Sequence, residues 1–394
     1  MLQLFNRASK DCIMQIINQK NRLVNKTSPK NLRQGGFSLI ELMVGLVIGL
    51  LVTLVIMQMF AAFEGQKRST SSTADAQTSG SVALYNLQRD VQLAGFGLPL
   101  FDEDNMPLNC IPMPTVNHDD NGATPLISLA PIDIVDGGAA AGASDTVTVR
   151  YGNSASGGVA VPVINRTGAA VDVDFNMDCD QDDVVIGING NVCVSTTVVA
   201  TPASNTQINL RNPFTGVNIG DSISCMGGWN EFQFQVVANQ LTRLNTFNNT
   251  VRTPVVDGIV NIQAQYGISA APDNNRITRW VNATGVWAAG AIGNSAVCTA
   301  TLSNRTCIKA VRVAIVARNG LLENLPAVSA ACSSITIANP VGVCAWDATS
   351  ANPVVASPAP LIDLSNTANW NQYRYKVYET IIPLRNIVWT RERL

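Results

Sequence analysis

The longest apolar stretch of the chain lies near its N-terminus. From Leu42 to Phe63 no charged side chain occurs over 22 residues. A helix needs about 20 apolar residues to cross a bilayer, so this stretch predicts a membrane-spanning helix. Glu41 stands directly before it. A carboxylate within a membrane segment costs roughly a few kcal/mol, so we expect Glu41 to have a function and a partner.

A second pattern follows the apolar stretch. The sequence turns polar and rich in Ser and Thr as far as Ser81, and apolar residues then recur at steps of three and four, at Leu84, Leu87, Val91 and Ala94. This spacing is typical of a helix that buries one stripe. The two patterns predict one long helix from Phe37 to about Ala94, ended by the Gly and Pro residues that follow. In its polar section, between Gly65 and Gly80, we expect a kink or break.

The rest of the chain shows the period-two and β-branched runs of β-strands, separated by Gly-, Asn- and Pro-rich loops. The runs are 146–151, 184–188, 192–199, 207–210, 232–237, 259–268, 310–317 and 375–382. A long N-terminal helix packed on an antiparallel β-sheet with a large β and loop insertion makes an α+β fold.

Charge divides the chain at Gly36. Residues 1–36 carry seven Lys and Arg against one Asp, a net charge of +6, and because the whole chain carries −2 the remainder carries −8. A basic segment before an apolar span predicts that the segment is cytoplasmic and that the chain after the span lies outside. The acidic remainder argues against nucleic acid as a partner, because phosphate binding needs a basic surface.

Eight of the nine cysteines follow the apolar stretch. An even number of cysteines in an exported segment predicts disulfides, here among Cys110, Cys179, Cys193, Cys225, Cys298, Cys307, Cys332 and Cys344. Sequence cannot choose among the pairings. Short loops favour Cys179–Cys193, Cys298–Cys307 and Cys332–Cys344, which leaves Cys110–Cys225. Zinc is the alternative, against which the missing Cys-x-x-Cys spacing and the single histidine, His118, both argue.

Neither catalysis nor a cofactor is expected. A lone histidine argues against Ser-His-Asp and Cys-His sites, and no Gly-rich phosphate loop occurs. One acidic run alternates in the manner of oxygen ligands for calcium, with Asp174, Asp178, Asp180 and Asp182 as the candidates. The EF-hand glycine and terminal glutamate are missing, so we interpret the run as a solvated acidic loop and keep Ca²⁺ as the alternative.

The segment Arg33-Gln34-Gly35-Gly36-Phe37-Ser38-Leu39-Ile40-Glu41-Leu42 resembles the processing and assembly signal of type IV pilins. The resemblance implies that a prepilin peptidase cuts after Gly36 and methylates the new amine of Phe37. It also implies that Glu41 pairs with the Phe37 amine of a neighbouring subunit in a filament. A pair with the amine of its own chain, or a protonated Glu41 in lipid, is the alternative. An ordinary signal anchor is the alternative to the whole assignment.

Further segments look like those of PilW-type minor pilins, namely 87–97, 256–268, 308–318 and 373–389. This resemblance implies a minor pilin that primes type IV pilus assembly with other minor and major pilins, near the tip and under a tip adhesin. A type II secretion pseudopilin is one alternative. Another is a tip module for adhesion or binding, built from residues 101–230, which resemble no family.

The expected organisation has four parts. Residues 1–36 form a cleaved leader, 37–63 the transmembrane and assembly half of the helix, 64–97 its amphipathic half, and 98–394 an exported, disulfide-bonded, β-rich head. Met14 is an alternative start.

Overall fold

The computed structural model describes residues 36–99, 110, 114–117, 126–175, 177–190, 192–199, 206–246, 251–272, 274–292, 304–322, 345–346, 360 and 362–388. Residues 1–35 of the expected leader, His118, Cys298, Cys332 and Cys344 lie outside these residues. The chain forms two compact units, residues 1–65 and residues 66–394. We call the second unit the head.

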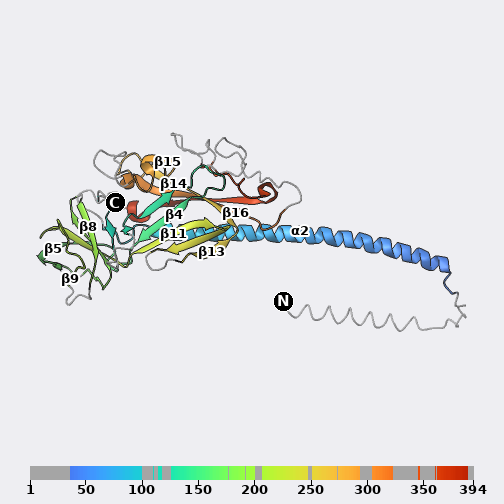
Figure 1. The fold of residues 1–394 in the computed structure, drawn as a ribbon, viewed down its shortest axis with the longest axis horizontal. Coiled ribbons are helices and arrows are strands. Elements are labelled where there is room, and N and C mark those ends of the chain that lie inside the picture. Colours follow the sequence, from blue (N-terminus) through green and yellow to red (C-terminus); the bar gives the residue numbers. More distant parts are fainter. Residues whose placement is uncertain are drawn as a thin grey trace, which may run out of the picture. The chain divides into compact units, whose positions relative to one another are not determined.

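One helix, α2 (Leu39–Leu93), contributes residues to both units (Figure 1). The expected break does not occur, because α2 is continuous for 55 residues. Hydroxyls in the polar section bond to carbonyls one turn earlier, Thr73 to Ser69 at 2.8 Å and Thr78 to Ala74 at 3.1 Å. These side chains satisfy their own polar groups without interrupting the helix.

The face of α2 that packs on the head extends further than the apolar pattern predicts. Leu87, Val91 and Ala94 are buried as expected, whereas Leu84 is half-buried. Small or polar residues continue the buried face towards the N-terminus and between these positions: Ser72, Ala76, Gly80, Ala83 and Asp90. Small side chains let the helix approach the sheets closely.

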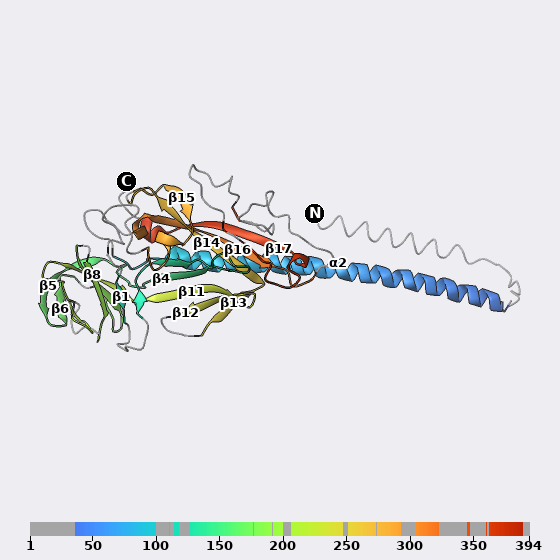
Figure 2. The ribbon, with the colours of Figure 1, turned by 45° about the horizontal axis from the view of Figure 1, so that its top comes forward.

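Two antiparallel sheets pack with α2 around the main core (Figure 2). The first has the order β13 (Thr253–Asp257), β12 (Gln240–Asn245), β11 (Asn230–Val237), β4 (Thr146–Tyr151) and β3 (Ile132–Val135). The second has the order β15 (Ile277–Val281), β14 (Ile259–Ser269), β16 (Ile308–Arg318) and β17 (Tyr375–Pro383). All eight expected runs contain a strand, and the α+β, pilin-like fold is confirmed.

The short elements are β1 (Thr115–Val116), β2 (Ile127–Ser128), η1 (Gly285–Trp287), η2 (Asn304–Cys307), η3 (Trp370–Gln372) and α3 (Arg385–Val388).

A third sheet lies between β4 and β11 in the sequence. Its order is β8 (Val192–Thr197), β7 (Val184–Asn189), β10 (Ser222–Gly227), β5 (Ala160–Thr167), β6 (Ala170–Val173) and β9 (Gln207–Asn209). A bridge between Val198 and Leu210 joins its two edges, so the sheet closes into a small barrel with its own core. We call residues 160–227 the barrel. It is inserted where a hairpin turn would connect β4 to β11, because Tyr151 and Asn230 are paired neighbours.

The C-terminal end of α2 is fixed next to the barrel. Gly95 and Gly97 have φ values of 79° and 82°, which favour glycine. The side-chain amide of Asn386 donates to the carbonyls of Ala94 at 3.1 Å and Gln92 at 3.3 Å. These carbonyls lack helical partners, so α3 caps the end of α2.

Candidate functional site: the N-terminal helix and its attachment

The N-terminal end of α2 holds the three residues of the expected processing and assembly signal. The carbonyl of Ser38 accepts from the amides of Glu41 at 3.0 Å and Leu42 at 3.1 Å, which closes the first turn. Glu41 lies in that turn, where a negative charge is favoured by the helix dipole. Phe37 is 76% exposed, and among the described residues beyond its chain neighbours none has an atom within 4 Å of a Cβ built on Gly36. The described part of the chain therefore does not cover the bond between Gly36 and Phe37.

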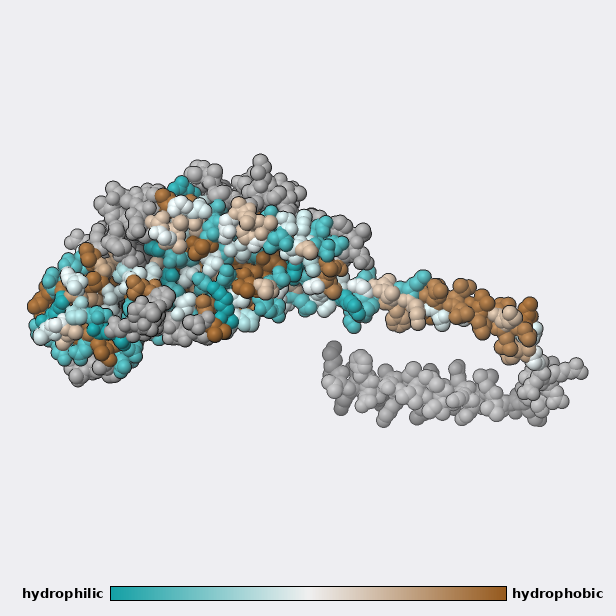
Figure 3. All heavy atoms as spheres, viewed as in Figure 1, coloured by the Kyte–Doolittle hydropathy of each residue, from teal (hydrophilic) through white to brown (hydrophobic). Residues whose placement is uncertain are grey.

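The following apolar surface is uncovered on every side. All large apolar side chains from Phe37 to Phe63 are between 45% and 76% exposed, and they form the brown section of the helix in Figure 3. By length and composition this helix can cross a membrane. So large an apolar surface needs lipid or other apolar helices to cover it.

The comparisons with known proteins agree with this geometry. Residues 31–57 match the prokaryotic N-terminal methylation motif, and residues 233–386 match the family described as type IV pilus-assembly protein W. These two matches support a PilW-type, pilin-like protein that carries the N-terminal methylation motif. They indicate a minor pilin related to the type IV pilus, with a structural role. No curated protein and no solved structure matches it.

In this PilW-type protein, the contacts between the matched family segment and α2 include the following three. The ring of Tyr378 packs on Gly80, so close that a Cβ there would lie 2.1 Å from a ring carbon. An ion pair of 3.0 Å joins Arg243 to the buried Asp90, and Asn386 provides the cap described above. The attachment thus depends on a glycine and a buried carboxylate, which an apolar pattern does not reveal.

Replacing Gly80 with alanine is expected to destabilise the head by about 1–3 kcal/mol, because the added methyl group overpacks against Tyr378. Alanine normally favours a helix over glycine by about 1 kcal/mol. Gly65→Ala is the matched control, since a Cβ at Gly65 meets no atom within 4 Å, and it should be neutral or stabilising. Denaturant unfolding of the detergent-solubilised chain measures both. Equal stabilities of the two variants would contradict the assigned contact.

A buried charge network lies inside the head and was not anticipated from the sequence. Asp133 on β3 bonds to Arg150 on β4 at 2.6 Å and to Arg305 in η2 at 2.9 Å, and Arg150 also bonds to Glu231 on β11. Burial lowers the pKa of Arg150, but the carboxylates of Asp133 and Glu231 outweigh it and raise that pKa above its usual value. Two cations and two anions balance here, and they tie together four elements of the head, β3, β4, β11 and η2.

Two disulfides contradict the pairing favoured by short loops. Cys110 is bonded to Cys193 and Cys179 to Cys225, with Cα separations of 5.5 and 5.9 Å. The expected Cys179–Cys193 and Cys110–Cys225 bonds are therefore wrong. Cys179 and Cys225 belong to the barrel core, whereas Cys110 and Cys193 lie at the main core. Cys179 and Cys193 are close in sequence but lie on opposite sides of the barrel wall, so they cannot pair with each other.

Cys307 is also disulfide-bonded, to a cysteine outside the described residues. The expected Cys298–Cys307 and Cys332–Cys344 bonds involve residues that lie outside the described part of the chain.

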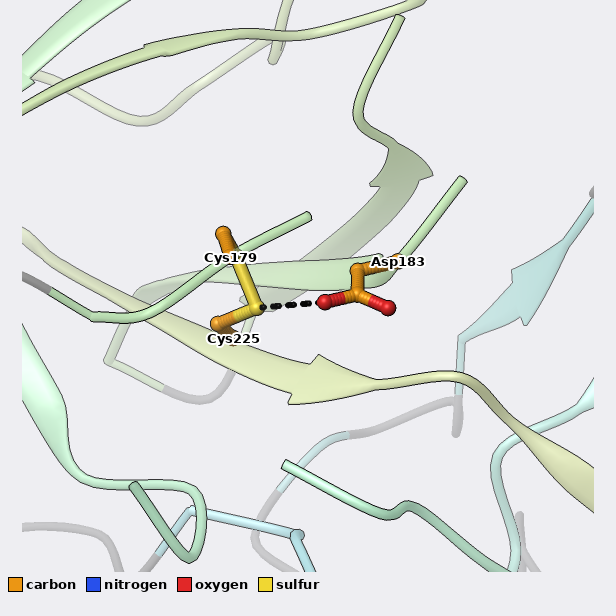
Figure 4. A group of neighbouring side chains, drawn as sticks. All are labelled: Cys179, Asp183 and Cys225. Atoms are coloured by element: carbon orange, nitrogen blue, oxygen red, sulfur yellow. Dashed lines mark hydrogen bonds between the residues drawn. A yellow bond between two sulfur atoms is a disulfide. The ribbon is translucent and has the colours of Figure 1, made fainter. Parts of the chain in front are cut away.

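The structure does not gather the expected calcium ligands. Within the described residues, one group of three potential ligands lies within 4.8 Å, and it consists of Cys179, Asp183 and Cys225 (Figure 4). Its two sulfurs are bonded to each other, so they are not free to ligate a metal. Asp182 instead pairs with Arg211 at 2.9 Å, and Asp174, Asp178 and Asp180 are exposed. The acidic run therefore gives no geometric support to a calcium site.

Proposed function

We propose that this protein is inserted in the inner membrane, is cut after Gly36 by prepilin peptidase, and then primes type IV pilus assembly with other minor pilins near the pilus tip. The observation that carries the proposal is the exposed apolar surface of α2, which begins at the methylation motif. A helix that is apolar all round suits both lipid and a bundle of similar helices. It can therefore pass from the membrane into a filament without exposing its surface to water.

Glu41 would direct that transfer. Cleavage after Gly36 places a new ammonium group on Phe37, four residues before the Glu41 carboxylate. A charge left unpaired in an apolar bundle is costly, and pairing it with an opposite charge offsets that cost. A subunit whose Glu41 meets the amine of its neighbour therefore enters the filament at a defined axial position.

Replacing Glu41 with alanine is expected to leave cleavage intact and to reduce incorporation into shed pili at least about tenfold, the equivalent of roughly 1.4 kcal/mol. Glu64→Ala removes a carboxylate from the same helix beyond the apolar stretch and should retain incorporation. Mass spectrometry of the N-terminus reports cleavage, and immunoblots of sheared filaments report incorporation. Normal incorporation of the Glu41 variant would contradict the role of this residue.

A gene deletion separates the pilus from a secretion filament. Loss of pili and of twitching motility supports the proposal. Accumulation of secreted enzymes in the periplasm, with pili retained, would instead favour the type II secretion pseudopilin.

The barrel favours a second candidate, a binding module for adhesion at the filament tip. It lies outside both matched segments and interrupts the hairpin of β4 and β11 without separating Tyr151 from Asn230. Residues 153–228 can therefore be replaced by an Asn-Gly turn, together with Cys110→Ser because the disulfide partner Cys193 is removed. Resistance to trypsin is the check on folding. Pili that form but fail to adhere would support the binding module. Unchanged adhesion would reject it.

A further inference from the structure

Basic side chains gather at the end of the head where α2 enters it. Lys67 and Arg68 lie on α2, Arg318 ends β16, and Arg374 and Lys376 lie at the start of β17. Four of them are exposed, and Arg318 is half-buried. We call these five residues the basic end.

Direct contacts hold these elements together. The amide of Gly320 donates to the Ser72 hydroxyl at 3.1 Å, which ties the end of β16 to α2. Two hydrogen bonds of 3.0 Å join Asn319 to Arg374. The backbone amide of Asn319 donates to the Arg374 carbonyl, and the side-chain oxygen of Asn319 accepts from the Arg374 backbone amide. The guanidinium of Arg318 stacks over the ring of Tyr373 at 4.2 Å. The basic residues of the two strands are thus held beside one stretch of helix.

The head is strongly asymmetric in charge. At the basic end, the five basic residues are accompanied by two acidic ones, Asp75 and Asp257, which gives a net charge of +3 over the stretches 66–76, 255–258, 317–320 and 370–376. Glu64, just before the first stretch, reduces this net charge only to +2. The barrel contains two Arg against seven Asp, a net charge of −5. Ser72 and Leu93, the last residue of α2, are 21 residues apart, or about 32 Å along the helix, and the chain reaches the barrel only beyond Leu93. This far exceeds the screening length of about 8 Å, so a surface near the basic end does not sense the acidic barrel.

The basic end is also the part of the head closest in sequence to the apolar stretch. Eight residues separate Phe63 from Ser72 along the chain. The half-buried Trp370 and Tyr373 add aromatic rings to this end, and such residues are enriched at membrane interfaces. A basic surface with aromatic residues next to a membrane anchor is suited to anionic headgroups.

We propose that the basic end binds anionic phospholipid headgroups of the membrane that α2 spans and holds the head of the unassembled subunit at that surface. This proposal rests on the membrane insertion proposed above. Each Lys or Arg near an anionic surface strengthens binding by about fivefold. The attachment is therefore strong enough to orient the head, and salt weakens it.

The test is hydrogen–deuterium exchange of the full chain reconstituted into neutral phosphatidylcholine vesicles and into vesicles with about one-third phosphatidylglycerol. Deuterium uptake by residues 317–320 and 370–376 is expected to be several-fold slower in the anionic vesicles, and 0.5 M salt should remove the difference. Flotation of the same samples reports insertion separately. A chain that fails to float refutes the proposed membrane insertion, whereas a chain that floats with equal exchange in both vesicles refutes only the lipid contact.

Matched variants locate the effect. Arg374→Glu with Lys376→Glu should abolish the difference between the vesicles. Arg276→Glu with Arg385→Glu makes the same change of charge at exposed positions of the head outside the basic end and should retain it. If both double variants lose the difference in deuterium uptake between the vesicles equally, the proposal is overturned. Protection that appears only after other pilins are added would also overturn it, because the partner would then be a protein.

Discussion

A Gly36→Glu variant is expected to accumulate as an uncut precursor held in the membrane, with a loss of pili as large as that of a gene deletion. In the proposed processing, prepilin peptidase brings the backbone at Gly36 close to its own catalytic groups, and only glycine leaves that approach open. Among the described residues beyond its chain neighbours, none has an atom within 4 Å of a Cβ at Gly36. The substitution therefore obstructs the peptidase without disturbing the fold.

The measurement is the mass of the membrane-extracted protein, which differs by the 36-residue leader between cut and uncut forms. Gly45→Ala is the matched control, because it changes another glycine with no atom within 4 Å of its Cβ position. We expect this control to be cut and methylated normally. A fully trimmed product from the Gly36 variant would disprove the assignment of the processing site.

An Asp133→Ala variant is expected to lose about 3–5 kcal/mol of folding free energy. Asp133 bonds to Arg150 and Arg305 at 2.6 and 2.9 Å, and all three side chains are buried. Removing the carboxylate breaks the ion pair of each guanidinium with Asp133, while Arg150 keeps its bond to Glu231. The two guanidinium groups lose their hydration on folding, and in the intact protein the bonds to Asp133 compensate for this loss. The variant lacks that compensation, so its folding free energy is less favourable.

Denaturant unfolding of the detergent-solubilised chain measures this loss. Asp257→Ala is the control, because it removes an exposed carboxylate from an edge strand of the same sheet, and it should change stability by less than about 1 kcal/mol. A similar loss of stability in the two variants would show that the Asp133 network does not stabilise the head.

The sequence predicts the helix and many of the strands well, because these depend on local patterns. The charge-free run to Phe63 and the spacing of Leu87, Val91 and Ala94 are visible in the sequence. The pattern does not reveal that Ser72 and Gly80 are also buried, since their small size matters rather than their hydrophobicity. Gly80 was expected to weaken the helix, and it instead provides space for Tyr378.

Features that depend on distant residues could not be predicted in this way. The barrel closes through Val198 and Leu210, and the charge network joins Asp133 to Arg305 across 172 residues. The disulfides illustrate the same point, because Cys179 and Cys193 are near in sequence but face different cores. Separation along the chain is a poor guide once a strand wall lies between two side chains.

The insertion of the barrel has an evolutionary consequence. A hairpin whose arms remain paired at Tyr151 and Asn230 can accept a closed module in place of its turn. This module also contributes Val184, Ile186 and Met226 to the main core and is bonded to it through Cys193. A different module at this point would have to replace these contacts, so the insert and the surface beneath it change together.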